Sequence, residues 1–397
     1  MKLSEKTLDC RLSPIRKFHP YAVSAAAQGK TIYHLNIGQP DIHTPAVYRD
    51  ALKSFSESVL AYAPSPGIPE LIDAIRGYYC DIGVRLERDN VLVTTGGSEA
   101  LDITMKCILD EDSEVIVAEP FYPNYYTFIR SNGGRVVPIP TCAENGYRFA
   151  SREKIEPLIT KKTRAILFTN PGNPTGTILS QEDLRLLADI AKEHDLYLIG
   201  DEVYREFIYD GSNRLSTIGS MEDVKENIIL IDSVSKRFSA CGARIGAMIS
   251  RNTELMQQAL KLAQARLSVA TVDQLAAAAL YSVDQSYFKA VRKEYRHRRD
   301  VCYAKLMEIP GVVCAEPMGA FYMMAKLPVD DTDKFQRWLL EEFEDHGETL
   351  MFAPGSGFYA AADGGRQEAR FAYVLEAPKL ARAMEILKKA IEQYNNR

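Results

Sequence analysis

Short apolar runs alternate with helical repeats between residue 91 and about residue 250. Each run is four or five residues long, a length and composition typical of a buried strand. The runs are Val91–Thr94, Val115–Ala118, Arg135–Ile139, Ala165–Phe168, Leu196–Gly200, Ile228–Asp232 and Ile245–Ile249. This alternation predicts an α/β fold, with a mostly parallel sheet between layers of helices.

Between the runs lie segments with the spacing of amphipathic helices. The clearest begins at Ser180, with Asp183 in the position that completes a capping box. Its apolar side chains recur at i, i+3, i+4 and i+7, namely Leu184, Leu187, Ala188 and Ala191. That spacing places them on one helix face, which we expect to pack on the sheet.

The pattern changes after residue 251. A helix-rich stretch covers about 252–307, a hairpin is predicted within Gly311–Ala325, and helices are predicted near 332–345 and 378–394. We therefore expect a large α/β domain and a smaller α+β domain. The expected parts are 1–47 as an N-terminal arm and part of the small domain, 48–290 as the large domain, and 291–397 as the rest of the small domain.

Composition excludes several classes of protein. The 397 residues are 46% hydrophobic and 25% charged, with a net charge of −5, which favours a globular enzyme over a nucleic-acid-binding protein. The seven cysteines include no C-x-x-C pair and the six histidines show no metal-ligand spacing, so neither a disulfide framework nor a metal site is predicted. No apolar run approaches the ~18 residues of a membrane span, and no secretory leader is visible. We expect a cytoplasmic protein that binds no membrane.

Candidate chemistry begins at Lys236, which follows the apolar run Ile228–Asp232. Burial favours the neutral form of a lysine amine, and the neutral amine attacks a carbonyl to form a Schiff base. The hydroxyls of Ser233 and Ser235 and the guanidinium of Arg244 are suited to a phosphate. A lysine beside a phosphate site is what pyridoxal 5'-phosphate (PLP) requires. Taken alone, the same segment also fits a solvated lysine at a strand end.

Two further strand ends carry polar groups. Asp201 closes the run Leu196–Gly200 and is a candidate partner for the pyridine nitrogen of PLP. Asn170 and Asn173 each precede a proline after another apolar run, and proline holds the preceding residue extended in a rigid turn. Asp201 alone also fits a helix cap, and the Asn-Pro loop alone also fits a connector. The loop, Asp201 and Lys236 nevertheless each lie at the end of a predicted strand, in that order along the chain, which makes coincidence unlikely.

At this point the chain resembles the fold-type I PLP enzymes, specifically the class I/II aminotransferases typified by aspartate aminotransferase. The resemblance extends from Ile15-Arg16 to Arg370-Phe-Ala-Tyr373. Its specific blocks are Asn173-Pro-Thr-Gly176, Asp201-Glu-Val-Tyr204 and Ser233-Val-Ser235-Lys236 followed by Gly242-Ala-Arg244. It implies a seven-stranded large domain that binds PLP, a smaller domain and a homodimer with shared active sites.

The resemblance also implies roles for individual residues. Lys236 would form the Schiff base and move protons, and Asp201 would pair with the pyridine nitrogen. Tyr204 and Asn173 would form hydrogen bonds with the cofactor's 3'-oxygen. The expected phosphate ligands are Ser233, Ser235, Arg244, Gly97, Ser98 and, from the partner subunit, Tyr62. Tyr122 would stack on the ring, and the expected substrate contacts are Gly38, Asn173 and Arg370, the last holding the α-carboxylate.

The implied activity is a ping-pong transamination in amino acid metabolism, from an aspartate-like or aromatic L-amino acid to a 2-oxo acid such as 2-oxoglutarate. A PLP-dependent carbon–sulfur β-lyase is the alternative. A ligand-sensing transcription regulator is disfavoured, because the segment before Gly38 is too short for a helix-turn-helix domain. One aspartate-using subgroup carries a lysine where this chain has Ser98, so the residue that binds the substrate side chain stays open. Arg16 and Arg266 are candidates, and Tyr122 and Tyr125 leave aromatic substrates possible.

Overall fold

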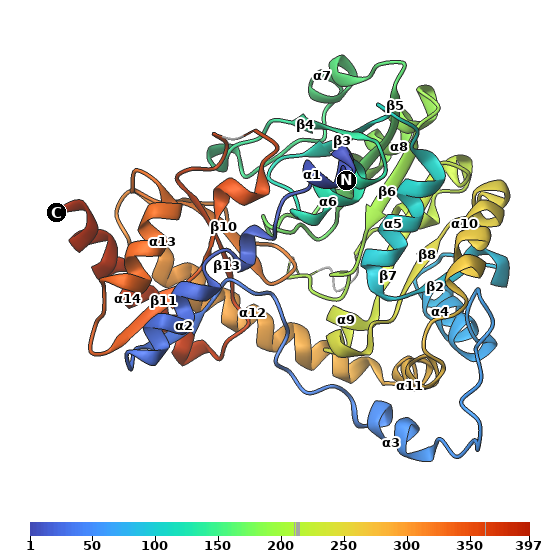
Figure 1. The fold of residues 1–397 in the computed structure, drawn as a ribbon, viewed down its shortest axis with the longest axis horizontal. Coiled ribbons are helices and arrows are strands. Elements are labelled where there is room, and N and C mark those ends of the chain that lie inside the picture. The colour runs from blue at the N-terminus through green and yellow to red at the C-terminus, as the bar shows by residue number, and fades with distance from the viewer. Residues whose placement is uncertain (210, 212–214, 362) are drawn as a thin grey trace.

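A sheet of seven strands forms the centre of the larger lobe in the computed structural model, which describes residues 1–209, 211, 215–361 and 363–397 (Figure 1). The strand order is β2-β8-β7-β6-β5-β3-β4. The strands are β2 Val91–Thr94, β3 Glu114–Ala118, β4 Arg135–Ile139, β5 Thr163–Thr169, β6 Tyr197–Asp201, β7 Ile228–Ser233 and β8 Gly246–Ile249. Within this sheet β8 is antiparallel to both of its neighbours, β2 and β7, and the other neighbouring pairs are parallel. The predicted strands are confirmed to within two residues.

Helices cover both faces of this sheet, because its strands alternate apolar side chains between two cores. On β5, Ile166 and Phe168 belong to one core and Ala165 and Leu167 to the other. The first core includes α4 Pro69–Asp81, α8 Gln181–Glu193 and α11 Thr271–Leu280; the second includes α5 Gly96–Ile108, α6 Asn124–Ser131 and α10 Thr253–Arg266. The predicted capping box on α8 is confirmed, since Asp183 N donates to Ser180 Oγ over 3.1 Å.

The remaining strands form two smaller sheets among the described residues. One has the order β12-β13-β10-β9, and in the other β1 pairs with β11 in parallel. Their bounds are β1 Thr31–His34, β9 Val313–Cys314, β10 Tyr322–Lys326, β11 Glu348–Met351, β12 Ala353–Pro354 and β13 Glu368–Ala372. The antiparallel pairing of β9 with β10 confirms the predicted hairpin.

Long helices pack against these smaller sheets (Figure 1). They are α12 Gln285–Met307, α13 Thr332–Glu341 and α14 Ala377–Asn395; the other helices are α1 Glu5–Leu8, α2 His19–Ala27, α3 Ala46–Ser54, α7 Arg152–Ile155 and α9 Val234–Arg237. The helix predicted over 332–345 ends earlier, at Glu341. Phe343 N bonds back to Trp338 O, five residues away, and the Phe343 side chain turns into the core.

We propose to keep the division into a large domain, 48–290, and a small domain made of 291–397 with 1–47. Two observations support it. The pairing of β1 with β11 joins the N-terminal segment to the C-terminal part. Along α12, Phe288 packs in the core of the large sheet, whereas Val291 packs in the core of the smaller sheets. Within the described chain, no helix combines the length and apolar character that a membrane span needs.

Candidate active site

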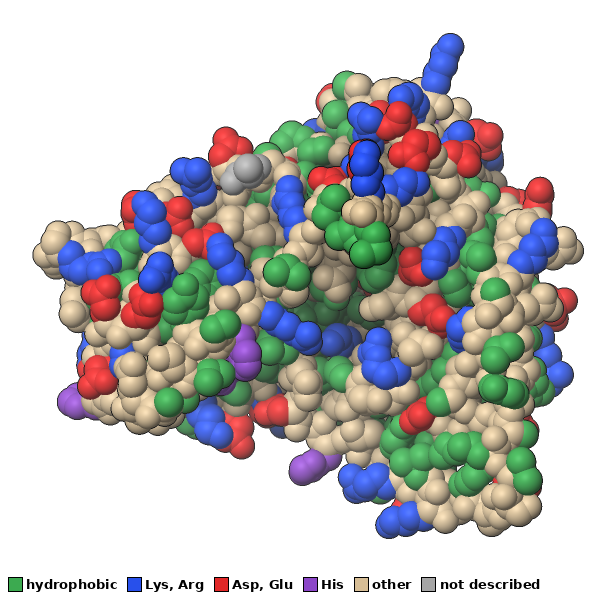
Figure 2. All heavy atoms as spheres, viewed as in Figure 1, with side chains coloured by type: hydrophobic (Ala, Val, Ile, Leu, Met, Phe, Trp, Pro, Cys, Tyr) green, Lys and Arg blue, Asp and Glu red, His purple; other side chains and the backbone are tan. Residues whose placement is uncertain are grey.

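A cavity of about 520 Å³ opens at the carboxyl ends of the parallel strands, where the chain leaves β5, β6 and β7. Figure 2 shows it as a hollow between the two lobes. Among the sequence-predicted residues, those lining the cavity are Arg16, Gly38, Gly97, Ser98, Tyr122, Asn173, Asp201, Tyr204, Ser233, Ser235, Lys236, Arg244 and Arg370. Tyr62 does not line it; this side chain is 80% exposed.

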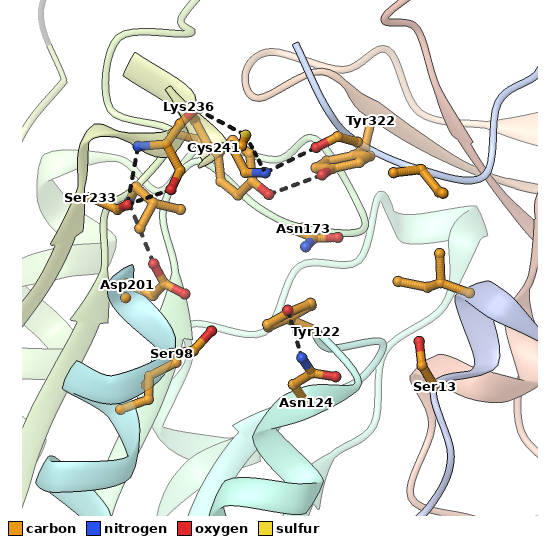
Figure 3. A pocket seen from close by; sticks show the side chains of 18 of the residues that line it. Ser13, Ser98, Tyr122, Asn124, Asn173, Asp201, Ser233, Lys236, Cys241 and Tyr322 are labelled. Atoms are coloured by element: carbon orange, nitrogen blue, oxygen red, sulfur yellow. Dashed lines mark hydrogen bonds between the residues drawn. The ribbon is translucent and has the colours of Figure 1, made fainter. Parts of the chain in front are cut away.

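Lys236 reaches the cavity from α9, directly after β7. Every residue of β7 is buried, and Ser233 at its end caps α9 by accepting a hydrogen bond from Ser235 N. The Lys236 amine donates to Gly38 O over 3.0 Å and lies 3.7 Å from Cys241 Sγ (Figure 3). The amine is therefore held inside the cavity by neutral groups, and no carboxylate of the described chain forms an ion pair with it.

Asp201 ends β6 with its carboxylate turned into the cavity (Figure 3). Tyr125 Oη donates to its Oδ2 over 2.5 Å, and Val203 N lies 3.4 Å from its Oδ1. Burial raises the pKa of Asp201 to about 6, and these hydrogen bonds oppose the rise. At pH 7 the carboxylate is mostly ionised, so it is ready to pair with a protonated ring nitrogen.

Arg370 lies on β13 and is 1% exposed. Its Nη1 donates to Asn173 Oδ1 over 3.0 Å and its Nη2 donates to Asn36 O over 2.5 Å, while Nε has no partner among the described residues. Burial lowers the pKa of Arg370 below its usual value. A buried guanidinium with a free N–H is suited to an anionic ligand that enters the cavity.

Tyr204 and Tyr322 form a pair beside Arg370 in the cavity wall. Their hydroxyls lie 2.9 Å apart, and the Tyr322 ring lies 4.4 Å from the guanidinium carbon of Arg370. Burial raises the pKa of Tyr204 well above its usual value, so its hydroxyl stays protonated. Gly38 lies against this pair, because a Cβ on it would come within 1.8 Å of Tyr322 Oη. Only glycine leaves room here for the backbone carbonyl that holds Lys236.

Groups suited to binding an anion meet where α5 begins. Gly97 and Ser98 lie in its first turn, where backbone N–H groups have no partner within the helix. The hydroxyls of Ser233 and Ser235, 2.8 Å apart, and the exposed guanidinium of Arg244 border the same cavity. β8 packs tightly on this turn: a Cβ on Gly246 would come within 2.5 Å of the backbone carbonyl carbon of Gly96.

Tyr122 lines the cavity, with its hydroxyl beside the Asn124 amide (Figure 3). Asn124 Nδ2 donates to its hydroxyl over 2.8 Å, and Tyr125 packs edge-on with a centroid distance of 5.4 Å. Burial raises the pKa of Tyr122 to about 12. Two neighbours thus fix the ring, as a stacking platform for a planar ligand requires.

Several lining residues escaped the sequence analysis. Tyr322 comes from the predicted hairpin, Cys241 from the segment between Lys236 and Arg244, and Ser13 from the N-terminal arm. Tyr322 and Ser13 are brought to the cavity from parts of the chain distant from Lys236, and no local pattern marks them. Cys241 lies only five residues from Lys236, but a lone cysteine there carries no recognisable motif. The hydrogen bond from Tyr125 to Asp201 was also not predicted, although the sequence places Tyr125 three residues after Tyr122.

The residues fit the cofactor that the sequence suggests. The α5 turn, two serine hydroxyls and a guanidinium suit a phosphate, and Asp201 suits a ring nitrogen. The Lys236 amine suits an aldehyde. The unpartnered Nε of Arg370 leaves one donor for the carboxylate of an amino acid.

Comparison with known proteins points the same way. The family model described as "Aminotransferase class I and II" matches residues 30–356. The chain is 31% identical to an aspartate aminotransferase of Bacillus subtilis over 100% of both chains, and 30% identical to an aromatic-amino-acid aminotransferase of Thermococcus litoralis over 99% of both. A solved structure of Thermus thermophilus aspartate aminotransferase with maleate matches with a TM-score of 0.89 and 28% identity, covering 98% of this chain and 100% of that one. Because the named relatives differ in substrate, they leave this chain's own substrate open.

Proposed function

Because the chain belongs to the class I and II aminotransferases, we propose that it transfers an amino group from an L-amino acid to a 2-oxo acid such as 2-oxoglutarate by a ping-pong mechanism. The enzyme is a PLP-dependent transaminase, as members of this family are. One observation carries the proposal: the amine of Lys236, the carboxylate of Asp201 and the guanidinium of Arg370 converge on one cavity. These groups are suited to the cofactor's aldehyde, its ring nitrogen and a substrate carboxylate.

PLP, when bound, supplies an aldehyde that condenses with amines and a protonated ring that accepts electrons from the substrate's Cα. The proposed phosphate ligands are Gly97, Ser98, Ser233, Ser235 and Arg244. Tyr204 and Asn173 are proposed to donate hydrogen bonds to the 3'-oxygen, and Tyr122 to cover one face of the ring. Their positions around one cavity support these roles.

Three side chains carry the proposed chemistry. Arg370 binds the α-carboxylate and so orients Cα, helped by Asn173, which already holds its Nη1. Lys236 accepts the α-proton at Nζ and returns it to another carbon. Asp201 keeps a proton on the ring nitrogen, and its own pKa of about 6 leaves it anionic at neutral pH.

The ping-pong order follows from the number of carboxylate sites in this arrangement. Donor and acceptor both carry an α-carboxylate beside the reacting carbon, and both need Arg370. The 2-oxo acid product must therefore leave before the second substrate binds.

The test is to load the purified protein with PLP, add single amino acids and follow the absorbance band of the bound cofactor. Amination of the cofactor by a donor, reversed by 2-oxoglutarate, is the expected result. Pyruvate release from cystathionine without any 2-oxo acid, with no amination by common amino acids, would instead favour the carbon–sulfur β-lyase alternative.

We also propose a cytoplasmic homodimer that shares its active sites. The cysteines of the structure are all free, which suits a reducing compartment. Val59, Leu60 and Tyr62 are exposed apolar or aromatic side chains in one loop, and such a patch is typical of an interface. Tyr62 is proposed to reach the phosphate bound by the partner subunit.

A further inference from the structure

The cavity holds one arginine to which the proposed function assigns no ligand. Its cationic lining residues in the described chain are Arg16, Lys236, Arg244 and Arg370, and its acidic one is Asp201. Figure 2 shows lysine and arginine side chains gathered at the mouth of the hollow. Under the proposed function Lys236, Arg244 and Arg370 each have a ligand, which leaves Arg16 without one.

Arg16 is also free of protein partners. Its side chain is exposed to the cavity mouth, and it makes no hydrogen bond or ion pair with any described residue. Nearby basic residues are engaged: Arg11 donates to Tyr359 O and Ala360 O, and Lys17 Nζ lies 2.6 Å from Asp333 Oδ1. The lack of a protein partner is therefore specific to Arg16 and is not shared by Arg11 or Lys17.

The backbone around Arg16 is nonetheless fixed. Pro14 packs so closely on Gly357 that a Cβ there would come within 2.2 Å of Pro14 Cβ. Asn36 Nδ2 donates to Ile15 O over 3.1 Å. Since the carbonyl of the preceding residue is held, the Arg16 side chain starts from a defined point beside the cavity.

Asn36 also joins Arg16 to the α-carboxylate site. This residue is 2% exposed, and its backbone carbonyl accepts the bond from Arg370 Nη2 while its side chain holds Ile15 O. One buried residue therefore holds both the Arg370 guanidinium and the residue before Arg16. A guanidinium held by Asn36 and a second, free guanidinium on a backbone held by the same residue therefore border one cavity. Two such groups match a ligand with two carboxylates.

The other arginine considered from the sequence is not available for this role. Arg266 does not line the cavity. Its Nη2 lies 3.2 Å from Ser65 O and 3.4 Å from Val93 O, and its Nη1 lies 3.5 Å from Glu99 Oε2. Ser98, which does line the cavity, is neutral.

We propose that Arg16 determines specificity by pairing with the side-chain carboxylate of a dicarboxylic amino acid or 2-oxo acid. The inference rests on the proposed function, because it takes Arg370 as the α-carboxylate ligand. The main competing role for Arg16 is to cover an aromatic side chain through a cation–π contact.

The kinetic test compares kcat/KM of the wild type, Arg16→Met and Arg16→Lys for L-aspartate, L-glutamate, L-alanine and L-phenylalanine. Arg16→Met should lower kcat/KM about 10- to 100-fold for the acidic donors, and less than about twofold for the others. The acidic donor whose kcat/KM falls more, L-aspartate or L-glutamate, identifies the preferred side-chain length. Arg16→Lys should retain part of the selectivity, since charge remains without the planar fork. Lys17→Met, which removes a neighbouring cation outside the cavity, should change no ratio between donors.

An equal loss for all donors, a selective loss for phenylalanine or no change would each overturn the assignment. A second readout needs no turnover: maleate binding to the PLP-loaded protein by calorimetry should weaken at least about tenfold in Arg16→Met but not in Lys17→Met. Equal maleate affinity in both variants would also overturn it. If none of the tested amino acids aminates the cofactor of the wild type, the proposed function fails. The maleate titration still decides in that case whether Arg16 binds a second carboxylate.

Discussion

Asp201 is a buried carboxylate whose charge is stabilised in this chain by hydrogen bonds rather than by an ion pair. Tyr125 Oη and Val203 N are its partners, and the charges of Asp232 and Lys236 act on it in opposite directions. Burial is the larger effect, so the pKa rises from 3.8 to about 6. The site thus holds a destabilising charge that a cationic ring would compensate.

A pH-dependent stability difference follows for Asp201→Asn. The native-state pKa lies above the unfolded one, so the wild-type apoprotein loses stability as pH rises from about 4 to 6. Asparagine carries no such charge. The variant apoprotein should therefore be more stable at pH 7.5, by at most about 3 kcal/mol, with the difference shrinking towards pH 4.5. Urea unfolding of both apoproteins across this range measures it, and a difference independent of pH would contradict the argument.

Arg370 supports a second prediction at this scale. It spans Asn173 Oδ1 and Asn36 O while keeping Nε free, and a lysine cannot make this set of contacts. Arg370→Lys should lower kcat/KM about 10- to 100-fold for acidic and neutral donors alike. A loss of kcat/KM confined to acidic donors would mean that Arg370 binds the side-chain carboxylate and Arg16 the α-carboxylate. Steady-state kinetics with L-aspartate and L-alanine distinguishes these outcomes.

At the scale of elements, the anion site depends on how closely β8 approaches the first turn of α5. Gly246 faces the backbone of Gly96 and Gly97, and an added Cβ would lie 2.5 and 2.6 Å from their C and N atoms. Backbone atoms cannot move aside as a flexible side chain can. The position of the α5 N–H groups is therefore set by the lack of a side chain on the neighbouring strand.

Gly246→Ala should displace the start of α5 and weaken PLP binding about tenfold or more, because the proposed phosphate site depends on that turn. The control is Gly77→Ala in α4, where a Cβ meets no atom within 4 Å. That variant should keep its PLP affinity and gain about 0.5–1 kcal/mol of stability. Cofactor titration by absorbance and thermal unfolding provide the two measurements. Unchanged PLP affinity in Gly246→Ala would show that the turn adapts.

At the scale of the whole molecule, Tyr62 is the predicted site residue that the cavity of one chain does not include. If it acts on the partner subunit, two inactive variants can restore one another. Lys236→Ala and Tyr62→Ala should each have little activity alone, whereas hybrids formed on mixing contain one site with both native residues. Random exchange of subunits should restore about a quarter of wild-type sites.

The two variants are mixed under conditions that allow subunits to exchange slowly. Activity and the mass measured by size-exclusion chromatography are followed over time to measure this recovery. A dimer without recovery would contradict the shared site, and a monomer would contradict the dimer. Mixing each variant with itself is the control.

The sequence by itself determined the sheet, its order of elements along the chain and most of the candidate site. Strand periodicity depends only on side chains close in sequence, so β2 to β8 were predictable from their apolar runs. Lys236, Asp201 and Asn173 lie at or just after the ends of strands, and the ends of parallel strands meet at one edge of the sheet. Their convergence on one cavity was therefore expected before the structure was known.

Only the tertiary structure decided which residues complete that site from distant parts of the chain. Arg16 and Arg266 were equal candidates in the sequence, but packing brings Arg16 to the cavity and ties Arg266 to Ser65 and Val93. Tyr322 lies 118 residues from its partner Tyr204. Such contacts depend on how separate elements dock and on which backbones approach closely, and no local pattern in the chain records that.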